Sequence, residues 1–104
     1  MAKIVILGGS FGGVTAAFEL RRLLREKAEI ILLCDLDKFV FIPSLPWIAM
    51  GWRRAEEITL SLKDILVPKG INFVHGGAES IDPDKSIVKT SSGEFPYDYL
   101  IIAT

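Results

Sequence analysis

The chain has 104 residues, half of them hydrophobic, and its 12 basic and 13 acidic residues leave a formal net charge of −1. This balance is typical of a folded globular protein, and one domain is expected at this length. A charge this close to zero, with no basic stripe, argues against nucleic acid as a partner, because phosphate binding needs clustered Lys and Arg side chains.

The first third of the chain predicts a strand, a helix and a second strand. Residues 3–7 form a short apolar run that ends at a glycine, as expected of a strand covered on both faces. From Gly12 the spacing becomes helical, and charged residues such as Arg21 and Arg22 lie on a predicted solvated face. The apolar stripe of this helix consists of Val14, Ala17, Phe18, Leu20 and Leu24. Residues 30–34 form a second apolar run, which should lie parallel to the first, so the segment predicts a βαβ unit.

The remaining elements are shorter. Past Asp37, several prolines and aromatic residues favour an ordered loop or a short helical turn. Residues 60–67 permit a short helix that ends at Pro68 and Gly70, and residues 71–75 have the composition of a third strand. Residues 78–81 and 86–90 are predicted to pair through the turn 82–85, in which Pro83 presets one backbone angle. Residues 99–103 have the composition of a buried strand that returns to the main sheet.

The turn between the first strand and the helix is rich in glycine. Its residues are Gly8, Gly9, Ser10, Phe11, Gly12 and Gly13. They fit Gly-x-Gly-x-x-Gly except at the middle position, where Ser10 stands. In this motif Gly8 allows the sharp turn, the middle residue faces a pyrophosphate, and Gly13 lets the helix and strand backbones approach closely. Amides at the helix start would bind the phosphates. Ser10 either donates its hydroxyl to a phosphate or holds the cofactor farther out and weakens its binding.

Cys34 and Asp35 follow at the end of the second predicted strand, about 20 residues past the glycine turn. A carboxylate here can accept hydrogen bonds from the ribose hydroxyls of adenosine and would repel a ribose phosphate, which favours FAD or NAD over NADP. Residue 34 or residue 35 can take this role. The alternatives are a solvated strand end for Asp35 and a small buried apolar residue for Cys34.

Other features limit where the protein works. The longest apolar run, residues 39–50, is broken by Pro43 and Pro46 and is too short to cross a hydrocarbon core of about 30 Å. The N-terminus lacks the order of a secretory signal, so a cytoplasmic location is expected. Cys34 is the only cysteine, so no disulfide framework or thiolate zinc site can form within the chain. His75 has no second metal ligand at a useful spacing, and we expect no chemical role for it.

The mean hydropathy of +0.39 is high for a small isolated domain, whose large surface needs polar cover. Together with a predicted strand that ends one residue before Thr104, it indicates a part of a longer protein. We predict an α/β fold, a Rossmann-like βαβ parallel sheet with a small antiparallel β-hairpin flap. Residues 1–104 would be the N-terminal part of an incomplete FAD-binding domain, and their exposed apolar surface should drive self-association.

The segment 41–53 resembles the sulfide:quinone oxidoreductases and their relatives, flavocytochrome c sulfide dehydrogenase and type II NADH dehydrogenase. Its sequence is Phe41-Ile42-Pro43-Ser44-Leu45-Pro46-Trp47-Ile48-Ala49-Met50-Gly51-Trp52-Arg53. Residues 78–83 and 97–104 are also similar to this family, so the resemblance covers essentially the whole chain. It implies two Rossmann-like domains with FAD in the first, and a protein that continues far beyond residue 104. Trp47 and Trp52 would either stack on a ring or pack at a domain interface.

The resemblance also implies roles for single residues. The glycine turn would bind the FAD pyrophosphate, and Cys34 and Asp35 would meet the ribose. Ile42 and Pro43 would approach the flavin, the backbone of Ala78 would contact the adenine, and residues 103–104 would pass near the cofactor. The candidate cofactor-binding residues are therefore Gly8, Gly9, Ser10, Phe11, Gly12, Gly13, Cys34, Asp35, Ile42, Pro43, Ala78 and Thr104. Relatives carry glycine where Ser10 stands, and serine or an acid where Cys34 stands.

In the enzymes that the chain resembles, sulfide attacks a disulfide or persulfide beside the flavin, FAD takes the electrons, and quinone reoxidises it. The resemblance implies that these cysteines, and the helices that dock the parent enzyme to the membrane surface, lie beyond residue 104. Residues 1–104 should therefore contain no catalytic residue and be inactive alone. The alternatives are the N-terminal portion of a type II NADH:quinone dehydrogenase, or a stand-alone nucleotide-binding module without catalysis.

Overall fold

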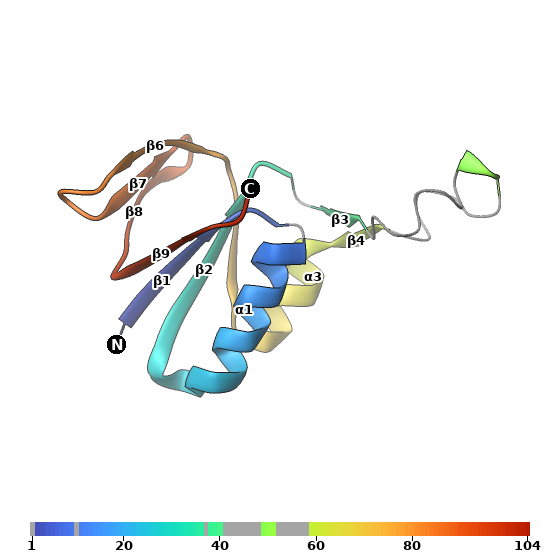
Figure 1. Cartoon of the computed structure of the whole chain (residues 1–104), viewed down its shortest axis with the longest axis horizontal. Helices are drawn as coiled ribbons and strands as arrows, with labels where there is room; N and C mark the ends of the chain where they lie inside the picture. The colour runs from blue at the N-terminus through green and yellow to red at the C-terminus, as the bar shows by residue number, and fades with distance from the viewer. Residues whose placement is uncertain (1, 10, 37, 41–48, 52–58) are drawn as a thin grey trace.

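A computed structural model of the chain describes residues 2–9, 11–36, 38–40, 49–51 and 59–104. Four parallel strands form the main sheet, with two helices on one face and a small antiparallel sheet on the other (Figure 1). The strands of the main sheet are β1 (Ala2–Leu7), β2 (Ala28–Cys34), β5 (Asn72–His75) and β9 (Tyr99–Ile102), in the spatial order β5-β2-β1-β9. The helices are α1 (Phe11–Leu24) and α3 (Leu62–Leu66). The predicted α/β class and the parallel βαβ unit are confirmed.

The two central strands are continuous apolar runs because both of their faces are covered. Successive side chains of a strand point to opposite faces of the sheet. Ile4 and Ile6 of β1 therefore pack under the helices, whereas Val5 and Leu7 pack under the antiparallel sheet. The register aligns Ile4 with Ile30, so β2 repeats the alternation beside β1. These strands form the centre of two hydrophobic cores, one on each side of the sheet.

Helix α1 packs on the sheet through small side chains. Gly13, Val14 and Ala17 are buried, and Phe18 and Leu24 of the predicted stripe are half-buried against the same core. A helix with such small residues at its contact face can lie close to the strands. The prediction of an apolar stripe on this helix is therefore confirmed.

Arg21 does not lie on a solvated helix face, as the sequence predicted, but is half-buried at the end of α1. Its Nη1 donates to the carbonyl of Arg25 and, at 3.0 Å, to that of Ala28, and its Nη2 donates to the carbonyl of Gly70 at 2.7 Å. A planar guanidinium with five donors can satisfy several carbonyls at once. Arg21 therefore joins the end of α1, the start of β2 and the turn before β5, a role that local charge spacing does not reveal.

Replacing Arg21 with methionine should lower the free energy of unfolding by about 1–3 kcal/mol, because the carbonyls that Arg21 binds lose their donor. Methionine keeps a similar apolar stem, so the loss of packing is small. The matched control is Arg22→Met. Arg22 pairs with Glu19 at 2.7 Å, and this ion pair lowers the pKa of the Glu19 carboxyl through a hydrogen bond and its charge. Both side chains are exposed, so the control should leave stability nearly unchanged. Urea unfolding measures the stability of both variants, and an equal loss of stability in the two would contradict the role given to Arg21.

The segment before β5 differs from the prediction. β3 (Lys38–Val40) pairs antiparallel with β4 (Thr59–Ser61), where the sequence favoured a loop followed by a helix from residue 60. Ser61 is instead the N-cap of α3, because its Oγ accepts from the amide of Asp64 at 3.4 Å. Pro68 lies inside a short 3-10 helix (Val67–Lys69) that is capped by Gly70, whose φ is +75°. The pairing of β3 with β4 joins segments far apart in sequence, so neither segment predicts it alone.

The antiparallel sheet consists of β6 (Ala78–Asp82), β7 (Ile87–Thr90) and β8 (Gly93–Pro96), in the order β6-β7-β8. The predicted hairpin is confirmed and extended by a third strand. Oδ1 of Asp82 accepts from the amides of Asp84 and Lys85 at 3.1 and 3.2 Å, which closes the turn. Val88 is fully buried and packs this sheet against the core formed by β1 and β2.

Strand β9 lies at the edge of the main sheet and pairs with β1. Tyr99 is 64% and Ile102 is 62% exposed, so the prediction of a buried strand is wrong at these positions. An apolar run shows that a strand can be buried, but not whether a neighbour covers it. Among the helices that the structure describes, none is long and apolar enough to cross a membrane.

Candidate dinucleotide-binding site

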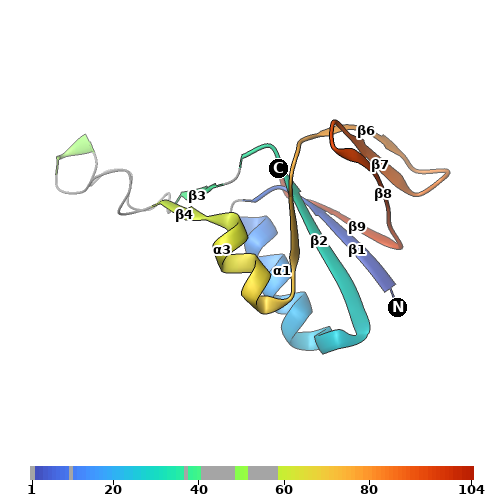
Figure 2. The same ribbon diagram turned by 180° about the vertical axis from the view of Figure 1, so that it is seen from behind.

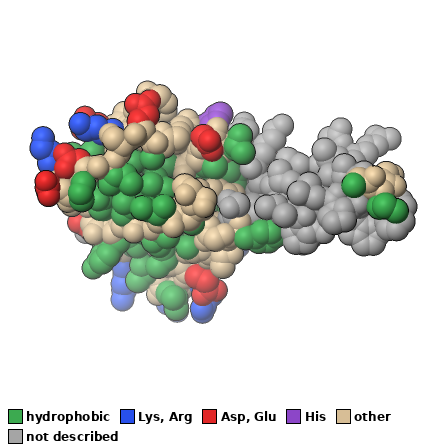
Figure 3. All heavy atoms as spheres, turned by 45° about the horizontal axis from the view of Figure 1, so that its top comes forward, with side chains coloured by type: hydrophobic (Ala, Val, Ile, Leu, Met, Phe, Trp, Pro, Cys, Tyr) green, Lys and Arg blue, Asp and Glu red, His purple; other side chains and the backbone are tan. Residues whose placement is uncertain are grey.

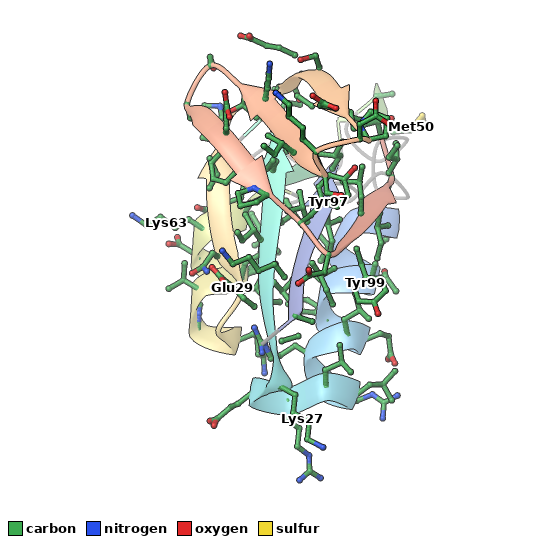
Figure 4. The ribbon with its side chains drawn as sticks, turned by 90° about the vertical axis from the view of Figure 1, so that its left-hand side faces the viewer. Lys27, Glu29, Met50, Lys63, Tyr97 and Tyr99 are labelled. Carbon is green, nitrogen blue, oxygen red and sulfur yellow. The ribbon has the colours of Figure 1, made fainter. Side chains whose placement is uncertain are left out.

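Four segments of the chain meet at the carboxyl ends of the parallel strands. Residues 8–9 and 11–13 follow β1, Asp35 follows β2, residues 76–77 follow β5, and residues 103–104 follow β9. Figure 2 shows the C-terminus at this end of the sheet and the N-terminus at the other, and Figure 4 shows Lys27 at the far end, before β2. Strand β1 has β2 on one side and β9 on the other, so the strand order reverses here. Ligands of such sheets bind in the crevice at this point.

The first and last glycines of the turn are needed for close backbone approach. Gly8 has a φ of +112°, and a Cβ on it would lie 2.3 Å from the carbonyl oxygen of Ala103. A Cβ on Gly13 would lie 1.9 Å from the carbonyl oxygen of Gly8. The close approach of helix and strand predicted for Gly13 is therefore found. For Gly8 the structure adds a reason that the motif does not contain, which is the end of β9 lying against it.

Gly9 and Gly12, the two inner glycines of the turn, differ in how much space surrounds them. A Cβ on Gly9 would lie 2.7 Å from Cδ1 of Leu62 and 3.0 Å from Sγ of Cys34, so α3 and β2 both close on the turn. A Cβ on Gly12 would lie 3.5 Å from the Cβ of Ala103, which is an ordinary contact. Gly9 is therefore constrained by packing, whereas Gly12 is not constrained in this way. The half-buried thiol of Cys34 helps to shape the turn.

Asp35 is exposed directly after β2, and residues 75–77 lie beside it. The amide of Gly76 donates to the carbonyl of Cys34 at 2.8 Å, and Nε2 of His75 lies 2.9 Å from the carbonyl oxygen of Asp35. A Cβ on Gly77 would lie 3.2 Å from the Cβ of Asp35. Sequence reasoning gave residues 75–77 no part in the site. The available signal was a pair of glycines directly after a predicted strand, the same pattern that marks the turn after β1.

The predicted site residues can now be placed. Those that lie at this edge of the sheet are Gly8, Gly9, Phe11, Gly12, Gly13, Cys34, Asp35 and Thr104. Ala78 begins β6 directly after Gly77. Ser10, Ile42 and Pro43 lie outside the described residues, as do Trp47 and Trp52.

The chemistry of this edge suits a dinucleotide. The amides at the start of α1, together with the positive end of its helix dipole, are donors for phosphate oxygens. The exposed carboxylate of Asp35 is an acceptor for hydroxyl groups. In the part of the chain that the structure describes, no group of three or more His, Cys, Asp or Glu side chains could hold a metal ion. The arrangement therefore offers phosphate and hydroxyl recognition on one sheet edge.

Comparison with known proteins agrees with this geometry. The family model of the pyridine nucleotide-disulphide oxidoreductases matches residues 2–104. The chain is 45% identical to the sulfide-quinone reductase of Aquifex aeolicus over 106 residues, which cover 100% of the chain and 24% of that protein. It is 26% identical to the type II NADH:quinone oxidoreductase of Staphylococcus aureus, with 97% of the chain and 25% of that protein covered.

A solved structure is similar over the same range. The X-ray structure of the sulfide:quinone oxidoreductase from Aquifex aeolicus superposes on the chain with a TM-score of 0.93 and 43% identity, covering 100% of the chain and 24% of that structure. The chain thus spans about a quarter of the length of the relatives that it matches. FAD is the cofactor of the matched family, as predicted. The chain belongs to the pyridine nucleotide-disulphide oxidoreductase family.

Proposed function

We propose that the chain is the FAD-binding N-terminal portion of a flavoprotein that transfers electrons from sulfide to quinone. The observation that carries the proposal is the glycine turn closed against β2 and β9 at the reversal of strand order, in a chain whose relatives include a sulfide-quinone reductase. The turn is shaped to admit a pyrophosphate at the start of α1. Residues 1–104 are proposed to be part of one Rossmann-like domain.

Each proposed contact belongs to one part of the cofactor. The amides of residues 8–13 bind the pyrophosphate, and Asp35, beside Cys34, accepts hydrogen bonds from the adenosine ribose. The backbone of Ala78 contacts the adenine, and Thr104 lies near the cofactor. Ser10, Ile42 and Pro43 are assigned on the sequence pattern alone. Bound FAD would supply the electron transfer from sulfide to quinone, while the residues of this chain bind and orient its ADP half.

The electron donor is tested in the protein expressed from its whole gene. We expect sulfide, and not NADH, to drive reduction of a soluble quinone analogue. The second candidate is the type II NADH:quinone dehydrogenase, which the weaker identity to the Staphylococcus aureus enzyme supports. Reduction with NADH and none with sulfide would favour that candidate. A purified protein that contains no flavin would favour a non-catalytic nucleotide-binding module.

Asp35 is the residue that should decide selectivity at the ribose. Asp35→Asn should weaken FAD binding about tenfold or more, because a hydrogen bond to a charged acceptor typically contributes about 1.5–3 kcal/mol. It should also reduce the preference for ADP-ribose over its 2′-phosphorylated form, since the repelling charge is gone. The matched control is Asp84→Asn, an exposed acid in the β6–β7 turn. Flavin fluorescence titration measures the first effect and competition with the two ADP-ribose forms the second.

Residues 1–104 by themselves are proposed to bind FAD weakly, because the rest of the protein also contacts the cofactor and each lost hydrogen bond costs on the order of 1 kcal/mol. The same titration on this segment checks the proposal. A folded segment that shows no flavin binding at all would leave the pyrophosphate site without support.

The edge strand β9 leads to a proposal about association. Tyr99 and Ile102 are exposed on it, and Figure 3 shows hydrophobic side chains gathered on one face of the described part of the molecule, with charged ones around them. Exposed strand edges and apolar patches favour pairing with another chain. Residues 1–104 are therefore proposed to self-associate. Sedimentation velocity that finds only monomer at high concentration would contradict this.

The location of the protein is proposed from its substrates. A quinone acceptor is dissolved in the lipid bilayer, so the protein is proposed to work at the membrane surface, and the N-terminal sequence supports the cytoplasmic side. Fractionation of cells should place it with the membranes in low salt and release it without detergent. Recovery that requires detergent would contradict peripheral attachment.

A further inference from the structure

His75 is the last residue of β5, and in the sheet register it lies beside Cys34, the last residue of β2. Its Nε2 is 2.9 Å from the carbonyl oxygen of Asp35. A carbonyl oxygen can only accept, so Nε2 carries a hydrogen and donates it. The ring therefore holds the backbone of the residue whose carboxylate is proposed to bind the ribose.

The ring and the backbone of His75 are each held by a neighbouring residue. The ring stacks on the ring of Phe73, with centroids 6.5 Å apart and planes 17° from parallel. The hydroxyl of Ser92 donates to the carbonyl of His75 at 3.4 Å, which ties the end of β5 to the turn between β7 and β8. His75 is thus positioned through its ring, by Phe73, and through its backbone, by Ser92.

Asp35 needs such a support because the pairing of β2 with β5 ends at Cys34. Its backbone is the first that the parallel ladder does not hold. Gly77 also approaches so closely that an added Cβ would lie 3.2 Å from the Cβ of Asp35. The placement of Asp35 therefore depends on His75 and Gly77 as well as on the thiol of Cys34, whose Sγ donates to Oδ1 of Asp35 at 3.8 Å.

We propose that His75 is a positioning residue that fixes the Asp35 carboxylate for selective binding of an adenosine ribose with a free 2′-hydroxyl. The proposal rests on the proposed function of this edge as the ADP-binding half of an FAD site. A carboxylate held in one orientation distinguishes a ribose that offers a hydroxyl from one that lacks it. A carboxylate that turns freely distinguishes them less.

The test uses the protein expressed from its whole gene, with the flavin removed, and calorimetric titration with ADP and with 2′-deoxy-ADP. The wild type should bind ADP about tenfold more tightly, the difference expected for one hydrogen bond to a charged group. His75→Leu should reduce that ratio at least about threefold. His75→Gln should keep it, because the amide nitrogen of glutamine can donate where Nε2 does. Asn72→Ala, an exposed change at the other end of β5, is the control and should leave the ratio unchanged.

The readout separates positioning from a merely structural role. Loss of stability alone would weaken both nucleotides equally and leave their ratio unchanged, and that result in His75→Leu would overturn the proposal. In the double variant with Asp35→Asn, His75→Leu should lower the ratio no further than Asp35→Asn does alone. A further drop would show that His75 acts independently of Asp35 and would also overturn it.

The proposal can still be tested if His75→Leu does not fold. Gly77→Ala then provides a second variant, because its Cβ would press on the Asp35 side chain at a φ that alanine accepts. Its ratio should also fall, and an unchanged ratio overturns the proposal. If the wild-type protein binds neither FAD nor ADP, the proposed function is wrong. If the wild type prefers ADP and the His75 variants keep the same preference, only the role of His75 is wrong.

Discussion

Alanine in place of Gly13 should destabilise the protein by about 3 kcal/mol or more, a cost at the upper end of that seen for overpacked sites. The added Cβ would lie 1.9 Å from the carbonyl oxygen of Gly8. That oxygen cannot move away easily. The amide of Gly8 donates to the carbonyl of Leu33 at 2.9 Å, and the amide of Ala103 donates to the carbonyl of Leu7 at 2.8 Å, so the backbone on both sides of Gly8 is held. The two nearest atoms to the new methyl group both belong to the Gly8 backbone, so either α1 or the end of β1 must shift.

The neighbouring glycine provides the matched control. Gly12→Ala adds the same methyl group to the same turn of α1, where the nearest atom would be the Cβ of Ala103 at 3.5 Å. Alanine is favoured over glycine inside a helix by up to about 1 kcal/mol, so stability should stay the same or rise slightly. Urea unfolding followed by far-UV circular dichroism measures both variants. Equal stability of the two would show that Gly13 does not serve close backbone approach.

Shortening Leu62 to alanine should cost about 2–5 kcal/mol, the range for removing a buried leucine side chain. Leu62 is fully buried at the start of α3. Leu60 is 52% exposed only two residues earlier, and Leu60→Ala should change stability by about 0.5 kcal/mol or less. The same unfolding experiment compares them. Similar losses in both variants would contradict the assignment of Leu62 to the core.

Leu62 also supports the glycine turn, and this can be tested separately. In the wild type, a Cβ on Gly9 would lie 2.7 Å from Cδ1 of Leu62. Once Leu62 is alanine, that obstacle is gone, so Gly9→Ala should be less destabilising in the Leu62→Ala background than in the wild type. Contacting residues commonly show such coupling, of about 0.5–3 kcal/mol. Strictly additive losses would show that α3 does not press on the turn.

Much of the fold follows from patterns within short windows. The apolar runs of β1 and β2, the helical stripe between them and the turn at Asp82 were all predicted, because each depends on neighbours within a few residues. The carboxyl-end location of the glycine turn and Asp35 followed as well, since parallel strands joined by a helix end at the same edge of the sheet. The order of residues thus determined the candidate site as far as β1 and β2 form it.

Other features depend on residues that meet only after folding. The prediction for Arg21 was wrong because one of the carbonyls that it binds belongs to Gly70, 49 positions away. The pairing of β3 with β4 and the exposure of β9 likewise depend on which segments come to lie beside them. A short stretch of sequence does not show which distant segments will pack against it.

By itself, the sequence determined a dinucleotide-binding unit with a glycine turn and an acid at the end of the second strand. The tertiary structure decided why Gly8 and Gly9 are needed, because Ala103, directly after β9, and Leu62 of α3 lie against them. It also decided what holds Asp35, because His75 lies 40 positions further along the chain and meets it only where β5 pairs with β2. Local composition selects the secondary structure, whereas the contacts that orient the site form across the sheet.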